Sequence, residues 1–300
     1  AERGTASAIF NASQYFSLVA FAPLMGWLAQ NYGWRSVFLA MGIIGLVGAA
    51  IFWLVVDSPA RHNWISRHEY DHIEKGGALV NLDRPAAAPQ AIRWSSVGQL
   101  LQNRMLLGIY LAQYCITALT YFYATWFPIY LIKARGMSLT GAGFASAGPA
   151  IAGFVGGVLG GVASDLLLKK GVPLSRARKT VILLGLVISC SILLANYTNS
   201  QFFIMMFMSF AFFGKGVAAL GWAVMSDAAP REATGLSGSI FNLFGNAAGI
   251  FTPIGIGYIL AATGNNWDMA LVFVFAHSIV AMISYGFITG EIKRVVLRPV

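Results

Sequence analysis

The sequence predicts an all-α membrane protein, and three observations support this fold class. Of the 300 residues, 57% are hydrophobic and only 10% are charged, whereas charged residues make up about a quarter of an ordinary soluble domain. The mean hydropathy is +0.68. The apolar residues also gather in stretches long enough to cross a bilayer, which takes about 20 residues. These features exclude a disordered chain and an ordinary water-soluble enzyme.

Eight such stretches follow one another along the chain. They cover residues 5–29, 36–56, 105–131, 139–168, 180–196, 202–227, 234–262 and 269–290. The one long polar segment separates the first two from the last six, so we expect a unit over 1–57, a loop over 58–98 and a second unit over 99–300. Within the loop, Ser66 and Glu69 form an S-x-x-E capping box, which predicts a short helix that reaches about Lys75.

The basic residues are distributed unevenly between the two sides of the predicted membrane. When the connections are assigned alternately to two sides, sixteen of the 20 Lys and Arg residues fall on one side, and only Arg35, Lys133 and Arg135 fall on the other. Lys215 lies within a span. By the positive-inside rule, both ends of the chain and the 58–98 loop are expected in the cytoplasm. The net charge of +9 is therefore a topology signal, which argues against a nucleic-acid partner.

Lys215 stands near the middle of the 202–227 span. A charged side chain at that depth costs roughly 2.5–3.5 kcal/mol on insertion scales, so it usually faces the interior of a helix bundle or a water-filled cavity. We expect Lys215 to contact an anionic substrate; the alternative is a structural lysine held by carbonyl groups or by an acid. Trp222, seven residues further on, is expected on the same helix face, with small residues keeping the surface between them open.

Three spans carry polar stripes at helical spacing. The stripes contain Ser7, Asn11 and Gln14 in the first span, Gln113, Thr117, Thr120 and Tyr121 in the third, and Ser239, Asn242, Asn246 and Gly249 in the seventh. Amides in hydrocarbon need partners, which either a neighbouring helix or the hydroxyl groups of a ligand can supply. Three stripes together with one buried lysine favour a polyhydroxylated anion as the ligand.

The fourth span carries two patterns that concern helix packing. Gly153, Gly157 and Gly161 form overlapping G-x-x-x-G patterns, which allow another helix to approach closely. At the end of the same span, Asp165 is followed by a cluster of basic residues that includes Arg176 and Arg178. We expect these charges to form a gating latch between neighbouring helices at the cytoplasmic side. The alternative is a positive-inside anchor with one incidental acid.

A zinc-protease pattern, H-E-x-x-H, occurs at His68, Glu69 and His72. On a helix it would place two imidazoles one turn apart with a glutamate beside them. The pattern lies on the short charged helix of the loop, and the sequence offers no convincing third ligand. A membrane metalloprotease is therefore kept only as an alternative, and we expect neither a metal nor another cofactor.

Five segments carry a family resemblance that covers essentially the whole chain. They are ERGTASAIFNASQYF (residues 2–16), EYDHIEKGGALVN (69–81), QYCITALTYFYATWFPIYL (113–131), GKGVAALGW (214–222) and GLSGSIFNLFGN (235–246). Together they resemble the anion:cation symporter family of the major facilitator superfamily, and most closely its bacterial glucarate and galactarate transporters. The resemblance implies a bundle of twelve spans in two halves of six. This chain would hold spans five to twelve, with residues 1–57 ending the amino-terminal half and 99–300 forming the carboxy-terminal half.

The function implied by the resemblance is secondary transport, not catalysis: proton-coupled uptake of a sugar diacid by alternating access across a bacterial inner membrane. The partners implied are the sugar-acid anion, the proton, the lipid bilayer and the four upstream helices. Gln14, Trp222 and Asn242 or Asn246 match substrate contacts of the family, and Lys215 would attract one carboxylate. A symporter of a monocarboxylate sugar acid, such as galactonate or a hexuronate, is the nearest alternative.

Overall fold

The computed structural model describes residues 17, 19–21, 24–25, 27–29, 31–57, 62, 65–75 and 94–298. In these parts of the chain the regular secondary structure is helical, without strands. Packing divides the chain into two units, one formed by Leu24–Arg93 and one that contains Trp94–Val300. Seven helical segments among the described residues are long and apolar enough to cross a membrane. The predicted all-α membrane class is confirmed.

The smaller unit holds α2 (Trp34–Val55) and α3 (Arg67–Lys75). α2 has no buried residue, and apolar side chains cover it on all sides, as expected of a helix that faces lipid. α3 begins with the predicted cap, because the Glu69 amide donates to Ser66 Oγ at 3.2 Å. Most of the first predicted span, including Asn11 and Gln14, lies outside the described residues.

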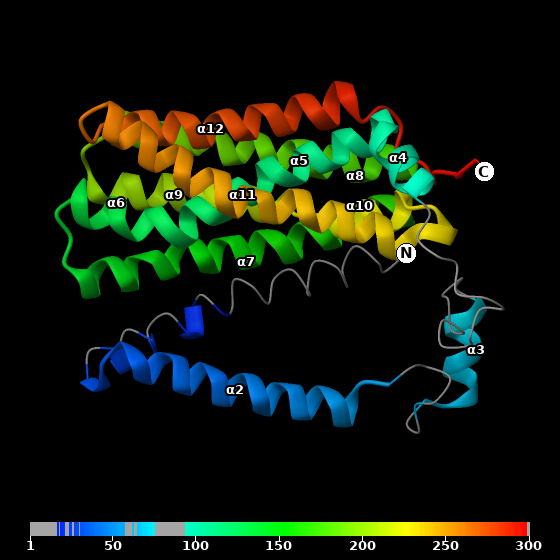
Figure 1. Ribbon diagram of the computed structural model, residues 1–300. Helices are drawn as coiled ribbons and strands as arrows, with labels where there is room; N and C mark the ends of the chain where they lie inside the picture. Colours follow the sequence, from blue (N-terminus) through cyan, green and yellow to red (C-terminus); the bar gives the residue numbers. More distant parts are fainter. Residues whose placement is uncertain are drawn as a thin grey trace. The chain divides into compact units, whose positions relative to one another are not determined.

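From Trp94 onward, the larger unit consists of α4 (Trp94–Gln102) and six membrane-length segments that pack into one bundle (Figure 1). In chain order these are α5 (Arg104–Tyr121) with the π-helical η1 (Phe122–Trp126) and α6 (Phe127–Lys133); α7 (Leu139–Lys169); α8 (Leu174–Ser189) with η2 (Cys190–Tyr197); α9 (Gln201–Val217) with α10 (Gly221–Ala228); η3 (Arg231–Ala233) with α11 (Thr234–Ala262); and α12 (Trp267–Ile283) with η4 (Ser284–Ile288). The six spans predicted after the polar loop are thus all present.

The sixth predicted span is not one continuous helix. α9 ends at Val217, and α10 begins at Gly221 after a turn in which the Leu220 amide donates to the Ala218 carbonyl at 2.8 Å. The expectation that Lys215 and Trp222 share one face of an unbroken helix is therefore wrong. The surface between them is also closed, because Ala218 and Gly221 are both buried.

Glycines allow α9 to pack tightly between α7 and α8. A Cβ added to Gly156 of α7 would collide with the Phe213 carbonyl of α9, and one added to Gly216 of α9 would collide with the Gly153 carbonyl of α7. On the side of α9 that faces α8, a Cβ added to Gly214 would collide with the backbone of α8. The predicted close approach through the glycines of the fourth span is confirmed, and it fixes α9 in one register against its neighbours.

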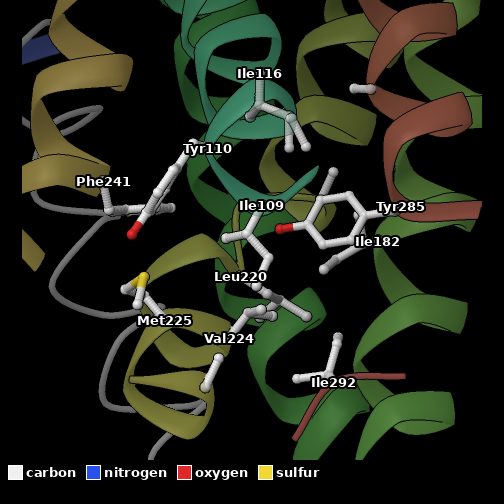
Figure 2. Packing of buried hydrophobic residues seen from close by; sticks show 14 of the residues in the cluster. Ile109, Tyr110, Ile116, Ile182, Leu220, Val224, Met225, Phe241, Tyr285 and Ile292 are labelled. Atoms are coloured by element: carbon white, nitrogen blue, oxygen red, sulfur yellow. The ribbon is translucent and has the colours of Figure 1, made fainter. Parts of the chain in front are cut away.

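An apolar cluster joins the helices at the end of the bundle where α4 and α10 lie. Figure 2 shows Tyr110 of α5, Phe241 of α11, Met225 of α10, Ile182 of α8 and Tyr285 of η4 packed around one another. All five side chains are at most 2% exposed. This cluster positions α5, α10 and α11, the three helices that carry most of the predicted polar residues.

We predict that Gly156→Ala destabilises the protein by about 1–3 kcal/mol, the usual cost of overpacking a dense interior. The matched control is Gly143→Ala in the same helix, where an added Cβ meets no atom within 4 Å. Thermal unfolding of the complete protein in detergent measures both variants. Equal midpoints for the two variants would contradict the glycine-dependent packing of α7 on α9.

Candidate functional site

The polar residues of α5 face glycines of α11 along one seam. A Cβ built on Gly245 of α11 would lie 3.3 Å from the Gln113 side chain and 3.5 Å from Thr117 Oγ1. One turn further along α11, Gly249 lies against the ring of Tyr121. The glycines therefore make room for the α5 stripe, and the two stripes predicted separately from the sequence meet in space.

Hydrogen bonds link the polar side chains of this seam. Tyr121 Oη donates to Asn246 Oδ1 at 3.2 Å, and Asn246 Nδ2 donates to Asn242 Oδ1 at 3.0 Å. Nearby, Gln113 Nε2 donates to Thr117 Oγ1 at 3.2 Å. The α5–α11 seam, defined by these five residues, thus contains two hydrogen-bonded groups of polar side chains on two membrane-length helices.

One edge of the α5–α11 seam is open. Asn242 and Asn246 are exposed, whereas Gln113, Thr117 and Tyr121 are partly buried. A side-chain amide has two N–H donors and an oxygen with two lone pairs, so the bonds above leave part of its capacity unused. Such a surface can bind a ligand that carries several hydroxyl groups.

Trp222 lies beside one end of the seam. Its ring packs edge-on against Phe241 at a centroid distance of 4.9 Å, and the preceding Gly221 is in contact with the Gln113 side chain. The structure thus brings Trp222 close to the polar stripe of α5. The sequence had instead suggested that Trp222 lies on the same helix face as Lys215.

Lys215 is enclosed within the larger unit. The residue is 5% exposed, and its Nζ lies 5.4 Å from the ring centroid of Phe212 one turn earlier. That ring packs on Tyr123 of η1 at 4.1 Å. The neighbours Gly214 and Gly216 hold α9 against α8 and α7. The ammonium group is therefore buried in the bundle and not on the open edge of the α5–α11 seam.

A buried charge cluster joins α7, α8 and α10. Arg178 Nη1 lies 3.1 Å from Asp165 Oδ1 and donates to Ser164 Oγ at 2.9 Å, while Arg178 Nε lies 3.1 Å from Asp227 Oδ2. The side chain of Arg178 is 2% exposed. One guanidinium thus ties together three helices, since it presents several N–H donors in a fixed fork.

The sequence analysis missed one member of this charge cluster and included one that lies elsewhere. Asp227 is 49 residues from Arg178 and follows the break between α9 and α10, so spacing along the chain gave no sign of the contact. Arg176 is exposed on α8 and is not brought into the cluster. The signal that could have identified Asp227 is an acid at the end of a membrane-length segment.

The H-E-x-x-H pattern lies on α3, where His68 and Glu69 are exposed. Among the described residues, no group of three side chains of the metal-ligating types is close enough to hold an ion.

Comparison with known proteins relates the chain to transporters. A sequence model of the Major Facilitator Superfamily matches residues 1–175. The probable galactarate/D-glucarate transporter GudP of Bacillus subtilis is 54% identical over 298 residues, covering 99% of this chain and 65% of that protein. GudP of Escherichia coli is 49% identical, covering 100% of this chain and 67% of its own length. The D-galactonate transporter of Escherichia coli is 38% identical, with 98% and 68% covered.

The chain spans about two thirds of the length of these curated relatives. Among solved structures, the fucose:proton symporter FucP of Escherichia coli superimposes with a TM-score of 0.52, covering 95% of this chain and 83% of that one. The sequence identity to FucP is 12%, so this similarity concerns the fold alone.

We predict that Arg178→Leu costs about 3–5 kcal/mol of stability, because it leaves two carboxylates without their buried partner. Arg176→Leu is the matched control, because Arg176 lies two residues away in the same helix and is exposed; a change within about 0.5 kcal/mol is expected there. Unfolding of the complete protein by denaturant in detergent compares the two. Equal losses of stability would show that the cluster does not hold α7, α8 and α10 together.

Proposed function

Because the chain belongs to the Major Facilitator Superfamily, we propose that it forms part of a secondary transporter for a sugar diacid of the galactarate and glucarate type. Two relatives that are 54% and 49% identical are probable galactarate/D-glucarate transporters, which supports this substrate class. The observation that carries the proposal is the α5–α11 seam, an open strip of amides and hydroxyls along two membrane-length helices. Polyhydroxylated acids offer the matching donors and acceptors.

The proposed transport is symport with a proton by alternating access. The solved fold neighbour is a proton symporter by its name, and the folds of this class work by rocking two halves around a central site. The asymmetry of the basic residues supports an orientation with α4, α10 and the carboxyl end on the cytoplasmic side of a bacterial inner membrane. The chain spans about two thirds of the length of its relatives, and we propose that helices in the remaining third are partners of the larger unit in transport.

In this proposal the α5–α11 seam binds the hydroxylated chain of the substrate. Asn242 and Asn246 offer amides at the exposed edge, and Gln113, Thr117 and Tyr121 extend the polar surface behind them. Trp222 closes one end of the seam. Asn11 and Gln14, which lie outside the described residues, would contribute from the first span.

Lys215 is proposed to supply the positive charge that selects an acid over a neutral sugar. A charge pair about 4 Å apart is worth roughly 4 kcal/mol at an effective dielectric near 20, before desolvation. With Lys215 only 5% exposed, direct contact with a carboxylate requires α10 to move relative to α9 at residues 218–220. The turn at this position is the natural hinge, because the glycine contacts hold α9 on its other sides.

The cluster of Asp165, Arg178 and Asp227 is proposed as a latch that favours one access state. It joins three helices at the predicted cytoplasmic end and is almost fully desolvated. A network of this kind adds stability only to the conformation in which all its members meet, so breaking it shifts the balance between states.

We predict that Asn246→Ala raises the apparent KM for labelled galactarate by about five- to tenfold, the equivalent of one or two hydrogen bonds. Lys215→Met is expected to raise it by at least about tenfold, through loss of the charge. The control is Gln102→Ala, an exposed amide on α4. Uptake into proteoliposomes by the complete natural protein measures all three. If Lys215→Met has the KM of the wild type, Lys215 does not contribute to substrate binding. If Asn246→Ala has the KM of the wild type, the α5–α11 seam is not the substrate site.

A monocarboxylate sugar acid is the second candidate substrate, because the chain is 38% identical to a D-galactonate transporter. We predict that unlabelled galactarate and glucarate inhibit uptake of labelled galactarate at least about tenfold more strongly than galactonate, since the second carboxylate adds a charge interaction. Competition over a concentration series gives the ratio. Stronger inhibition by galactonate would reverse the assignment.

A further inference from the structure

A large polar cavity lies at the end of the larger unit opposite the Arg178 cluster. Its volume is about 910 Å³. It is formed by α6, by the end of η2 and by the connection between α11 and α12, at the left end of the bundle in Figure 1. In the orientation proposed above, this end faces away from the cytoplasm.

The charge of this outer cavity is unusual for its side of the membrane. Lys133 and Arg135 line it, with Asp268 as the one acid among the lining residues. These two cations are also two of the three basic residues that the sequence assigns to the outer side. The positive-inside rule disfavours cations there, so retention of two in one cavity calls for a local reason. Attraction of an anion is such a reason.

The structure holds one of the two cations in place and leaves it donors to spare. Arg135 Nε donates to Tyr130 Oη at 2.9 Å, and the guanidinium carbon lies 5.3 Å from the centre of the same ring. Arg135 Nη2 also donates to the Ala195 carbonyl at 3.5 Å. A guanidinium has five N–H donors, so at least two remain for a ligand. Lys133 is exposed at the rim.

The rest of the outer cavity suits a hydroxylated ligand. Asn196 lines it, and the buried Asn196 Oδ1 accepts no hydrogen bond from the described part of the protein, while Asn196 Nδ2 donates to the Asp268 carbonyl at 3.1 Å. That oxygen is shielded from the cavity, but the exposed side chains of Asn199 and Asn265 also line it and offer amide donors and acceptors to the hydroxyl groups of a ligand. Trp126 and Trp267, whose centroids are 6.0 Å apart, supply aromatic surface beside these polar groups, a combination common in small-molecule sites.

The outer cavity and the α5–α11 seam lie along the same side of α11. A Cβ built on Gly257 of α11 would lie 3.5 Å from Trp126, just as Gly245 faces Gln113 and Gly249 faces Tyr121. Gly257 and Trp126 both line the cavity. The outer cavity therefore begins about two turns of α11 beyond Gly249, on the same face of α11 as the seam.

We propose that the outer cavity is a capture site, in which Lys133 and Arg135 bind a carboxylate of the sugar acid before it reaches the α5–α11 seam. The inference rests on the proposed function. Fixed positive charge at the mouth of a path raises the local concentration of an anion and its rate of entry, in a way that salt screens.

The test is uptake of labelled galactarate by the complete protein in proteoliposomes at low and high salt. Lys133→Gln is expected to raise KM by roughly three- to tenfold at low ionic strength, with little change in Vmax and a smaller effect at high salt. Lys133→Arg, which keeps the charge, should restore the wild-type KM. The control is Lys170→Gln. Lys170 is exposed and follows the carboxyl end of α7, so this substitution should leave KM unchanged.

Each other outcome has a distinct meaning. If Lys133→Gln has the wild-type KM at low salt while wild-type uptake is normal, the capture site is wrong and the proposed function stands. If the wild type takes up no sugar acid, the proposed function itself fails. The KM change must also persist in liposomes of purely zwitterionic lipid. Its loss there would mean that the cations act through anionic lipid at the bilayer surface, which overturns the proposal.

Discussion

The hydrocarbon interior of a bilayer offers no hydrogen-bond partners, and this constraint accounts for the polar contacts buried between the helices of the larger unit. Tyr123 Oη donates to the Met208 carbonyl at 2.7 Å, and Ser284 Oγ donates to the Gly108 carbonyl at 2.7 Å. Arg178 is satisfied by two acids and a serine. Asn242 and Asn246 differ from these groups, because their amides are exposed on a membrane-length helix and keep unused donors and acceptors. We interpret them as groups whose remaining partners come from outside the unit.

The backbone of the larger unit combines a dense layer with an adaptable face. Glycine contacts press α9 against α7 and α8 so closely that backbone atoms touch. The α5–α11 seam, in contrast, runs into the π-helical η1 directly after Tyr121, and π-helical turns are frequent at functional sites. The break at residues 218–220 lies between these two regions. A rigid layer beside a polar face with irregular backbone is a sound basis for a site whose geometry changes during transport.

The sequence predicted those features that depend on local pattern. The lengths of the apolar stretches predicted the six spans after the polar loop, and the capping residue Ser66 predicted the start of α3. The G-x-x-x-G spacing predicted the close contact of α7 with another helix, which is α9. The polar stripes were also visible, because they repeat at helical spacing. That the α5 and α11 stripes meet in one seam was not visible, since their partners are more than a hundred residues apart, as in the bond from Tyr121 to Asn246.

Features set by packing between distant segments escaped the sequence. An unbroken helix from Lys215 to Trp222 was expected because apolar composition continues through residues 218–220, yet tight contacts hold α9 on α7 and α8 while Gly221 packs toward Gln113 and Phe241. The burial of Lys215 follows from the same packing. Asp227 was overlooked as a partner of Arg178 because only the turn at 218–220 and the course of α10 bring it there.

The central claim is that the face formed by α5 and α11 holds the substrate. A structure of the complete protein with galactarate bound tests it most directly. The account predicts ligand density within hydrogen-bond distance of Asn246 and Gln113, with one carboxylate on the side of Lys215. Density for galactarate at the centre of the protein, without contact to any residue of α5 or α11, would contradict it.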